Sequence, residues 1–137
     1  MPPSKMTTTS ISLKPTALKE AIDTKSLVLF HAPWCGHCTR FKPTYDAFAD
    51  IAKSQFPDVH VTKINFDKYG NDVRPFLVGG DATVGSLVTG FPTLVAFNHG
   101  EYKIYDQKRT VDGLVEFTKQ FFGASQTMSD SEEEYFQ

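Results

Sequence analysis

Cysteine is scarce in this chain of 137 residues, which contains only Cys35 and Cys38. A chain of this length can bury a hydrophobic core without disulfides, unlike the small cysteine-rich scaffolds of secreted proteins. A bridge between these two residues would also close a very short loop, for which the entropic stabilisation is smallest. The scarcity and spacing of the cysteines therefore disfavour a purely structural bridge.

Long apolar runs and clusters of basic residues are also lacking. The sequence has no run of about 18 apolar residues, so we expect no transmembrane helix and no membrane partner. The formal net charge is −2, and no cluster of Lys and Arg favours nucleic-acid binding. Residues 1–10 lack the apolar core of a secretory signal peptide.

Candidate metal ligands are few and scattered. A structural zinc or iron–sulfur site needs four ligands, usually with several cysteines. The histidines fall in different predicted elements: His31, His37, His60 and His99. A c-type haem signature would need His directly after the second cysteine, where this chain has Thr39. We expect no metal site, and a redox couple is the leading interpretation of the cysteine pair.

The apolar pattern predicts one α/β domain over residues 10–123, with a central mixed β-sheet and helices on both faces. A flexible arm, 1–9, precedes it, and a disordered acidic tail, 124–137, follows it. The predicted elements are an edge strand at 10–13, a helix from Pro15, a buried strand at 27–30, a long helix at 36–54 kinked at Pro43, a strand at 59–66, a mixed segment at 68–90, a hairpin of 93–98 and 101–106, and a closing helix at 111–122.

The predicted position of the cysteines explains how they could react. Cys35 follows a buried strand and starts the long helix, where unpaired N–H groups and the helix dipole favour a thiolate, the nucleophile of disulfide exchange. Cys38 lies one turn later and can resolve a mixed disulfide on Cys35. Gly36 leaves the approach open, and Trp34 stiffens the entry. A partly protonated His37 would stabilise the thiolate and make the pair more oxidising.

Several motifs in this order resemble the thioredoxin superfamily, and within it the catalytic domains of protein disulfide isomerase. The first is Ala32–Cys38, whose Gly-His dipeptide between the cysteines is isomerase-type. Pro43 matches the proline that kinks the family's active-site helix. The segment Gly90–Thr93 matches the cis-proline loop, and Tyr105–Arg109 resembles an ending of isomerase domains, with Gln107 where glycine is usual.

The resemblance implies a thioredoxin fold and assigns further roles. Pro92 is expected to be cis and to face the cysteines, so that the adjacent backbone pairs with an extended substrate chain. The substrate-binding residues implied are Trp34, Gly36, Phe91, Pro92 and Thr93. Arg109 matches an arginine that helps the buried cysteine ionise. A solvated arginine at a helix start is the alternative for Arg109.

Three further departures from the family pattern bear on function. Leu29 stands six residues before Cys35, where the family usually has a buried acid that accepts the proton of the second cysteine. His31 replaces an aromatic residue, and we interpret it as packing, with proton transfer as the alternative. An insertion at about 76–89 precedes the cis-proline loop. It either reshapes substrate access or is a neutral surface loop.

The leading hypothesis is a thiol–disulfide oxidoreductase that forms, reduces or rearranges disulfides in protein substrates through Cys35 and Cys38. The alternatives are a thioredoxin-fold peptide-binding module with weak redox turnover and a metal carrier. The resemblance implies no bound cofactor, since the cysteine pair exchanges electrons with glutathione or a partner oxidoreductase. We expect a monomer. The compartment stays open between the endoplasmic reticulum lumen, for a segment of a secretory-pathway protein, and a cytosolic or virus-encoded enzyme.

Overall fold

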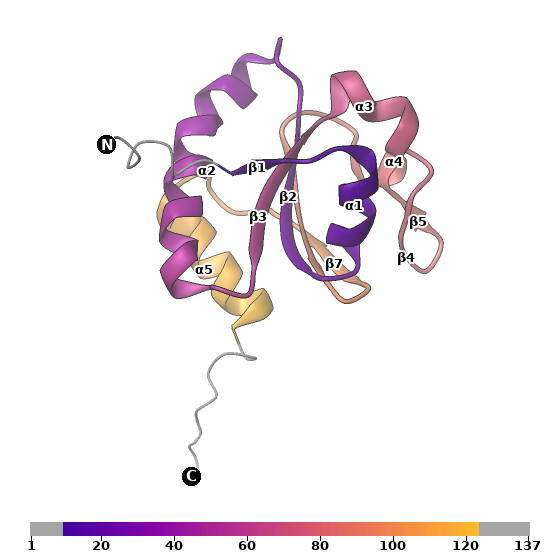
Figure 1. The fold of residues 1–137 in the computed structure, drawn as a ribbon. Helices are drawn as coiled ribbons and strands as arrows, with labels where there is room; N and C mark the ends of the chain where they lie inside the picture. Colours follow the sequence, from indigo (N-terminus) through magenta and orange to yellow (C-terminus); the bar gives the residue numbers. More distant parts are fainter. Residues whose placement is uncertain (1–9, 124–137) are drawn as a thin grey trace, which may run out of the picture.

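The computed structural model describes residues 10–123, and the expectations for 1–9 and 124–137 lie outside this part of the chain. Figure 1 shows a central sheet with helices around it. The elements in chain order are β1 (Ile11–Ser12), α1 (Pro15–Ile22), β2 (Lys25–His31), α2 (Gly36–Gln55), β3 (His60–Asn65), α3 (Phe66–Val73), β4 (Leu77–Gly79), β5 (Ala82–Thr83), α4 (Val84–Leu87), β6 (Thr93–Asn98), β7 (Glu101–Ile104) and α5 (Val111–Phe122).

The main sheet is mixed and has the strand order β1-β3-β2-β6-β7. β1 and β2 both run parallel to β3, whereas β6 is antiparallel to β2 and to β7. β2 therefore pairs on both sides, and all five of its inner residues, 26–30, are buried. A strand buried on both faces reads as a continuous apolar run, which is the pattern that predicted it.

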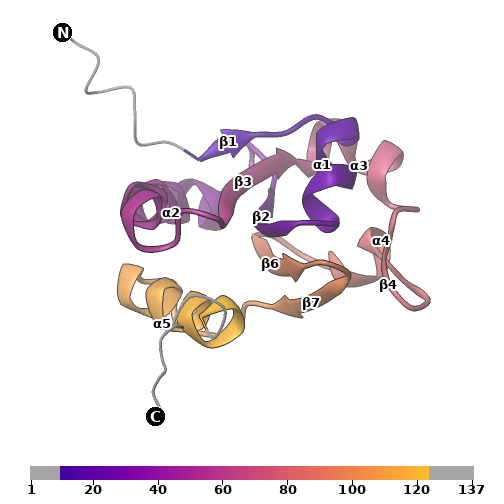
Figure 2. The same ribbon diagram turned by 60° about the horizontal axis from the view of Figure 1, so that its bottom comes forward.

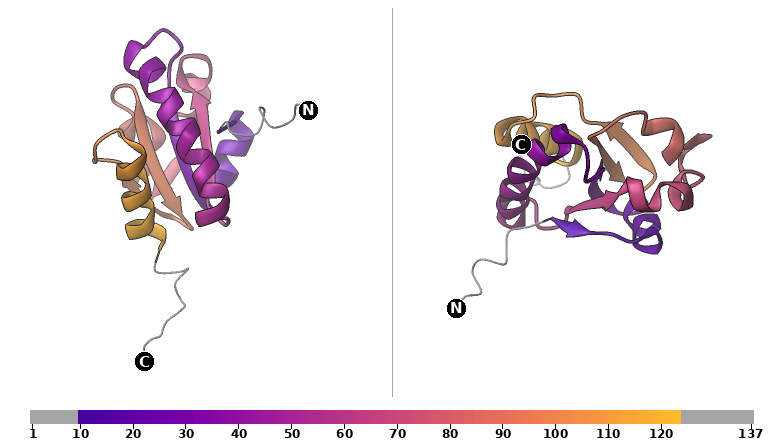
Figure 3. Two further views of the ribbon diagram at one scale, coloured as in Figure 1. Left: turned by 90° about the vertical axis from the view of Figure 1, so that its left-hand side faces the viewer. Right: turned by 90° about the horizontal axis from the view of Figure 1, so that it is seen from above.

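Helices cover both faces of this sheet. α2 and α5 lie on one face, and α1 and α3 lie on the other (Figure 2). Figure 3 shows α2 and α5 side by side over their face. Successive residues of β2 point to opposite faces, so Leu27 and Leu29 enter the core under α2, while Val28 and Phe30 enter the core under α1. Within the described residues, no helix is long and apolar enough to cross a membrane.

The element boundaries follow from local hydrogen bonds. β3 ends at Asn65 rather than at Phe66, because the Asn65 side chain accepts a hydrogen bond from the Lys68 N–H at 3.0 Å and caps α3. The hairpin turn at His99 and Gly100 has positive φ at both residues, 48° and 95°. Two positive φ angles fit a tight hairpin turn. The predicted hairpin is therefore confirmed, although β7 ends at Ile104.

The segment predicted to be an insertion, 76–89, contains short secondary-structure elements of its own. β4 and β5 form a two-stranded antiparallel sheet, and α4 follows directly. Three of its valines are buried in the core under α1: Val78, Val84 and Val88. At Gly79 a Cβ atom would lie 3.2 Å from the Gly100 carbonyl oxygen, so a larger residue would crowd this contact with the β6–β7 turn. These contacts attach the insertion to the sheet edge.

Candidate active site

The two cysteines stand at the start of α2 in different environments. Cys35 is the N-cap residue, with extended backbone angles (φ −87°, ψ 119°), and is partly exposed. Its N–H donates to the Ala32 carbonyl at 3.1 Å, and its own carbonyl accepts from the Thr39 N–H at 3.1 Å. Cys38 lies inside the first turn and is only 6% exposed. Both are free thiols in this structure.

The start of the helix acidifies the outer cysteine. The backbone N–H of Cys38 contributes most to lowering the pKa of Cys35. The Cys38 thiol, the His37 N–H and the positive charge of Arg40 act in the same direction, and only burial opposes them. Unpaired N–H groups at a helix start stabilise an anion in this way. Cys35 is thus the group of the pair that ionises first.

Burial has the opposite effect on the inner cysteine. It raises the pKa of Cys38, and the neighbouring Cys35 raises it further through its side chain and charge. Hydrogen bonding with the Ala32 backbone and the positive charge of Arg109 partly offset this rise. The structure therefore pairs an accessible thiol of lowered pKa, Cys35, with a buried thiol of raised pKa, Cys38.

The loop before β6 lies against Cys35. The Phe91–Pro92 peptide bond is cis, which confirms the expectation drawn from the family resemblance. The Cys35 Sγ lies 3.8 Å from the Phe91 carbonyl oxygen, which accepts a hydrogen bond from the thiol. Thr93 fixes the loop from the other end, because its hydroxyl donates to the Gly90 carbonyl at 2.7 Å. Of the predicted residues, Phe91 therefore contacts the thiol directly, and Pro92 and Thr93 follow it in the same loop.

Trp34 forms an exposed but anchored surface next to Cys35. Its side chain is 68% exposed, yet its indole N–H donates to the Asp67 carboxylate at 2.9 Å. Its ring also meets Phe91 edge to face, with the centroids 5.8 Å apart. Asp67 lies in the first turn of α3, far away in the sequence. Sequence reasoning missed Asp67 because no local pattern links it to the indole.

Gly36 and His37 are exposed on the first turn of α2. A guanidinium nitrogen of Arg40, Nη2, lies 3.0 Å from Nδ1 of His37. The other one, Nη1, would lie 3.4 Å from a Cβ atom placed on Gly36. Sequence reasoning also missed Arg40, although its spacing of three and four residues from His37 and Gly36 is the spacing of helical neighbours.

Arg109 belongs to a loop that Tyr105 organises. The Tyr105 hydroxyl donates to the Lys108 carbonyl, and its ring packs edge to face on Phe117 of α5 at 5.0 Å. Burial, with a smaller effect of the nearby Asp106, raises the pKa of Tyr105 to about 12. This loop borders a pocket of about 230 Å³, whose lining includes Phe41, Pro92, Leu94 and Arg109. The exposed Arg109 thus lies on the same side of the domain as the cis-proline loop.

Leu29 and His31 point toward α2 from the strand beneath the cysteines. Leu29 is 3% exposed and packs in the core under α2. His31 is half-buried, and burial, followed by the charges of Lys63 and Lys42, lowers its pKa. The two lysines that influence His31 electrostatically, Lys63 on β3 and Lys42 on α2, therefore lie on the face of the sheet that α2 covers. Both roles considered for His31, packing and proton transfer, stay predictions.

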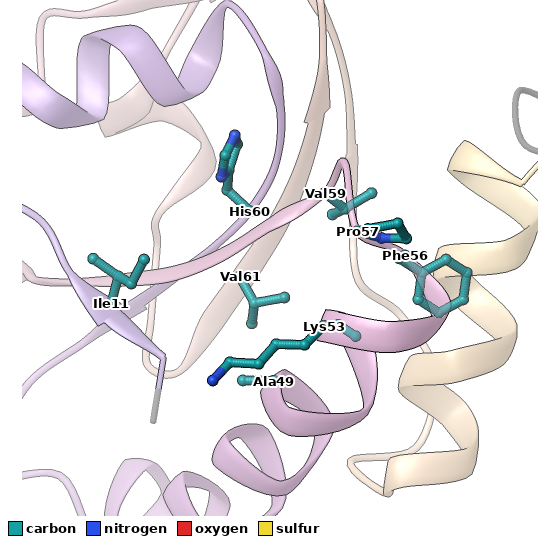
Figure 4. Close-up of a pocket in the computed structure, with 9 residues that line it drawn as sticks. Ile11, Ala49, Lys53, Phe56, Pro57, Val59, His60 and Val61 are labelled. Carbon is teal, nitrogen blue, oxygen red and sulfur yellow. The ribbon is translucent and has the colours of Figure 1, made fainter. Parts of the chain in front are cut away.

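A second pocket lies away from the cysteines. It has a volume of about 250 Å³ and lies between β1, the C-terminal half of α2 and β3. Figure 4 shows Ala49, Val61 and Ile11 at this pocket, with His60 and Val61 on opposite sides of β3. Across residues 10–123, no group of three or more His, Cys, Asp or Glu side chains is placed to hold a metal ion.

Comparison with known proteins gives consistent matches. Residues 9–120 match the family model described as thioredoxin. Protein disulfide-isomerase of Saccharomyces cerevisiae is 38% identical over 97 residues, which are 69% of this chain and 16% of the yeast protein. Protein disulfide-isomerase 5-2 of Arabidopsis thaliana is 33% identical over 126 residues, which are 90% of this chain and 26% of the plant protein. The chain therefore spans only a minor part of the length of these relatives.

The fold also matches solved structures. Human ERp44 in its zinc-bound form superposes with a TM-score of 0.66 at 22% identity, over 82% of this chain and 30% of the human one. This likeness concerns the fold alone. It confirms the expected mixed sheet flanked by helices, in the arrangement found in thioredoxin domains.

Proposed function

This chain belongs to the thioredoxin family, and we propose that it is a thiol–disulfide oxidoreductase of the protein disulfide isomerase type. Its curated relatives are protein disulfide isomerases. The observation that carries the proposal is the asymmetry of the cysteine pair. A partly exposed Cys35 with a lowered pKa stands before a buried Cys38 with a raised pKa, and the cis-proline loop lies alongside.

Reduction of a substrate disulfide takes two exchange steps. The Cys35 thiolate attacks one sulfur of the substrate, the substrate S–S bond breaks, and the departing sulfur takes a proton. Cys38 then loses its proton and attacks the Cys35 sulfur of the mixed disulfide. The Cys35–Cys38 bond forms, the second substrate sulfur leaves and is protonated, and two electrons have passed to the substrate.

The reverse sequence oxidises a substrate dithiol. If another thiolate of the substrate attacks the mixed disulfide before Cys38 does, Cys35 is released and the substrate keeps a rearranged disulfide. Oxidised or reduced enzyme is regenerated by glutathione or by a partner oxidoreductase. The second step depends on ionising Cys38, whose pKa burial raises and Arg109 partly lowers. Leu29 cannot accept that proton, so we assign the assisting charge to Arg109.

The substrate chain lies along the surface between Trp34 and the cis-proline loop. The anchored indole of Trp34 offers an apolar face beside Cys35. Gly36 leaves the approach to the sulfur free of a side chain, and the backbone next to Pro92 offers hydrogen-bonding groups to an extended peptide. Protein and peptide chains that contain cysteine are the substrates that fit this surface.

Insulin reduction and oxidative refolding of a reduced protein test the proposal. Cys35→Ser abolishes both activities, because the attacking thiolate is gone. Cys38→Ser still forms mixed disulfides with substrate and accumulates them, because the resolving thiol is gone. The double-serine variant is the control for non-redox effects. Activity that survives in Cys35→Ser would contradict the proposal.

A peptide-binding module is the second candidate, and the buried Leu29 favours it. With an apolar residue in place of the usual acid, turnover is slow while the binding surface is kept. In that case the double-serine variant binds unfolded client proteins as well as the parent, and the parent shows negligible exchange. Fast exchange by the parent excludes this candidate.

A further inference from the structure

The guanidinium group of Arg40 lies at the start of α2, on the side of the cysteine pair. A helical side chain leans toward the N-terminus of its helix, and Arg40 reaches back over one turn in this way. Its Nη2 lies 3.0 Å from His37 Nδ1, and its Nη1 occupies the space beside the missing side chain of Gly36. Arg40 is therefore held next to the residues that separate the two cysteines.

This contact decides which form of His37 is compatible with the structure. A guanidinium has only donors and keeps its proton in proteins. Nδ1 of His37 must then accept the hydrogen bond, which leaves its single proton on Nε2. The imidazole in this contact is neutral, so it does not bring a positive charge to Cys35.

The charged and titratable groups around the pair come from three elements. On α2 they are Cys38, His37 and Arg40, and the charge of Arg40 acts on Cys35. From the loop before α5, Arg109 acts on Cys38. From α3, Asp67 is bound to the Trp34 indole. The charge of Arg40 thus lowers the pKa of Cys35, whereas the charge of Arg109 lowers the pKa of Cys38.

We propose that Arg40 is a positioning residue of the dithiol, which holds His37 as the neutral Nε2–H tautomer and itself supplies the positive charge that faces Cys35. The proposal rests on the proposed function, because it explains how the thiolate of that reaction is stabilised. It departs from the sequence-based prediction that a protonated His37 has this role. Its consequence is that the reactivity of Cys35 depends on the side chain at position 40.

The test measures the pH profile of Cys35 alkylation by iodoacetamide, together with the ¹⁵N NMR signals of the His37 ring. The parent shows a single ionisation step and a neutral Nε2–H ring. In Arg40→Ala the alkylation rate at mildly acidic pH falls about threefold, the effect of one exposed unit charge nearby. The His37 ring then loses its single Nε2–H pattern, because the guanidinium no longer holds Nδ1 as a hydrogen-bond acceptor.

Two variants sharpen the result. Arg40→Lys keeps the charge and restores most of the parent rate, whereas Lys53→Gln, near the far end of α2, leaves the profile unchanged. A His37 ring protonated at both nitrogens in the parent near neutral pH would overturn the proposal, as would an unchanged profile in Arg40→Ala. Neither readout uses a disulfide substrate. A failure here is therefore distinct from a failure of the proposed function, which the insulin assay reports.

Discussion

Leu29 and Lys63 are register partners in the parallel pair of β2 and β3. Register partners on neighbouring strands point to the same face, which here is the face covered by α2. The Lys63 side chain is only 11% exposed, and its Nζ lies 4.0 Å from an Asp46 carboxylate oxygen on α2. Asp46 on the helix, rather than residue 29 on the neighbouring strand, is thus the carboxylate partner of this largely buried lysine.

Leu29→Glu should accelerate the step that uses Cys38. A carboxylate at this position can accept a proton, and Lys63 beside it favours its ionised form. We expect mixed disulfides with glutathione to resolve about a hundredfold faster near neutral pH, the lower end of the range of general-base effects. Rapid-quench kinetics measures this rate.

Leu29→Gln is the matched control for this substitution. It buries a polar group of the same size that cannot accept the proton. Both variants lose about 2–4 kcal/mol of unfolding free energy, because Leu29 packs in the core. Equal rates in the Glu and Gln variants would show that another group already serves Cys38.

Asp46 should make stability depend on pH in the acid range. Burial alone would raise the pKa of Asp46, but hydrogen bonds from Ser10 and Lys42 and the charge of Lys63 hold it below its ordinary value of 3.8. A lowered pKa stabilises the fold above the unfolded-state value, and this contribution is lost as the pH falls through the folded-state value. The loss therefore lies below pH 3.8.

Asp46→Asn removes the charge and tests this relationship. We expect it to lower the unfolding free energy by about 1.5–3 kcal/mol near neutral pH, the range for hydrogen bonds to charged groups. The difference from the parent should shrink as the pH falls below 3.8, because the parent then gradually loses the same charge. Urea unfolding measures both, with the exposed Asp50→Asn on the same helix as control. A difference that is constant with pH would contradict the assignment.

Asp67 should restrict the motion of the Trp34 ring. Asp67→Ala removes the acceptor of the indole N–H, so the ring is held only by its contact with Phe91. Trp34 is the only tryptophan of the chain, and time-resolved fluorescence anisotropy reports its motion directly. We expect faster ring motion and a KM for peptide substrates about twofold to tenfold higher, the equivalent of one hydrogen bond.

Asp72→Ala, on the same helix as Asp67, is the control for removing a carboxylate from α3. It should leave the anisotropy decay and the KM unchanged. An Asp67→Ala variant with parent-like anisotropy would show that the hydrogen bond does not hold the indole.

Local patterns predicted the elements that position the site. The apolar run at 27–30 predicted a strand buried on both faces, and the turn at His99 and Gly100 predicted the hairpin of 93–98 and 101–106. The apolar spacing after Cys38 predicted α2 to within one residue at its C-terminal end. These elements could be predicted from the sequence because the apolar pattern of a buried strand or helix and the residue types of a turn extend over only a few neighbouring residues.

Contacts between distant segments were not readable from the sequence. Asp67 meets Trp34 only after β3 and α3 have packed beside the active-site loop, and Lys63 meets Asp46 only across the layer between sheet and helix. The insertion at 76–89 has short strands and several glycines, so its buried valines did not form a recognisable period. The cis bond before Pro92 was predicted through the family resemblance and not by composition.

The redox potential of the Cys35–Cys38 couple tests the central claim most directly. Equilibration of the protein with mixtures of reduced and oxidised glutathione, followed by quantification of the free thiols, gives this potential. We expect a value near that of protein disulfide isomerase, about −180 mV, because the helix start and Arg40 stabilise the Cys35 thiolate and no proline lies between the cysteines. A value near that of thioredoxin, about −270 mV, would contradict it.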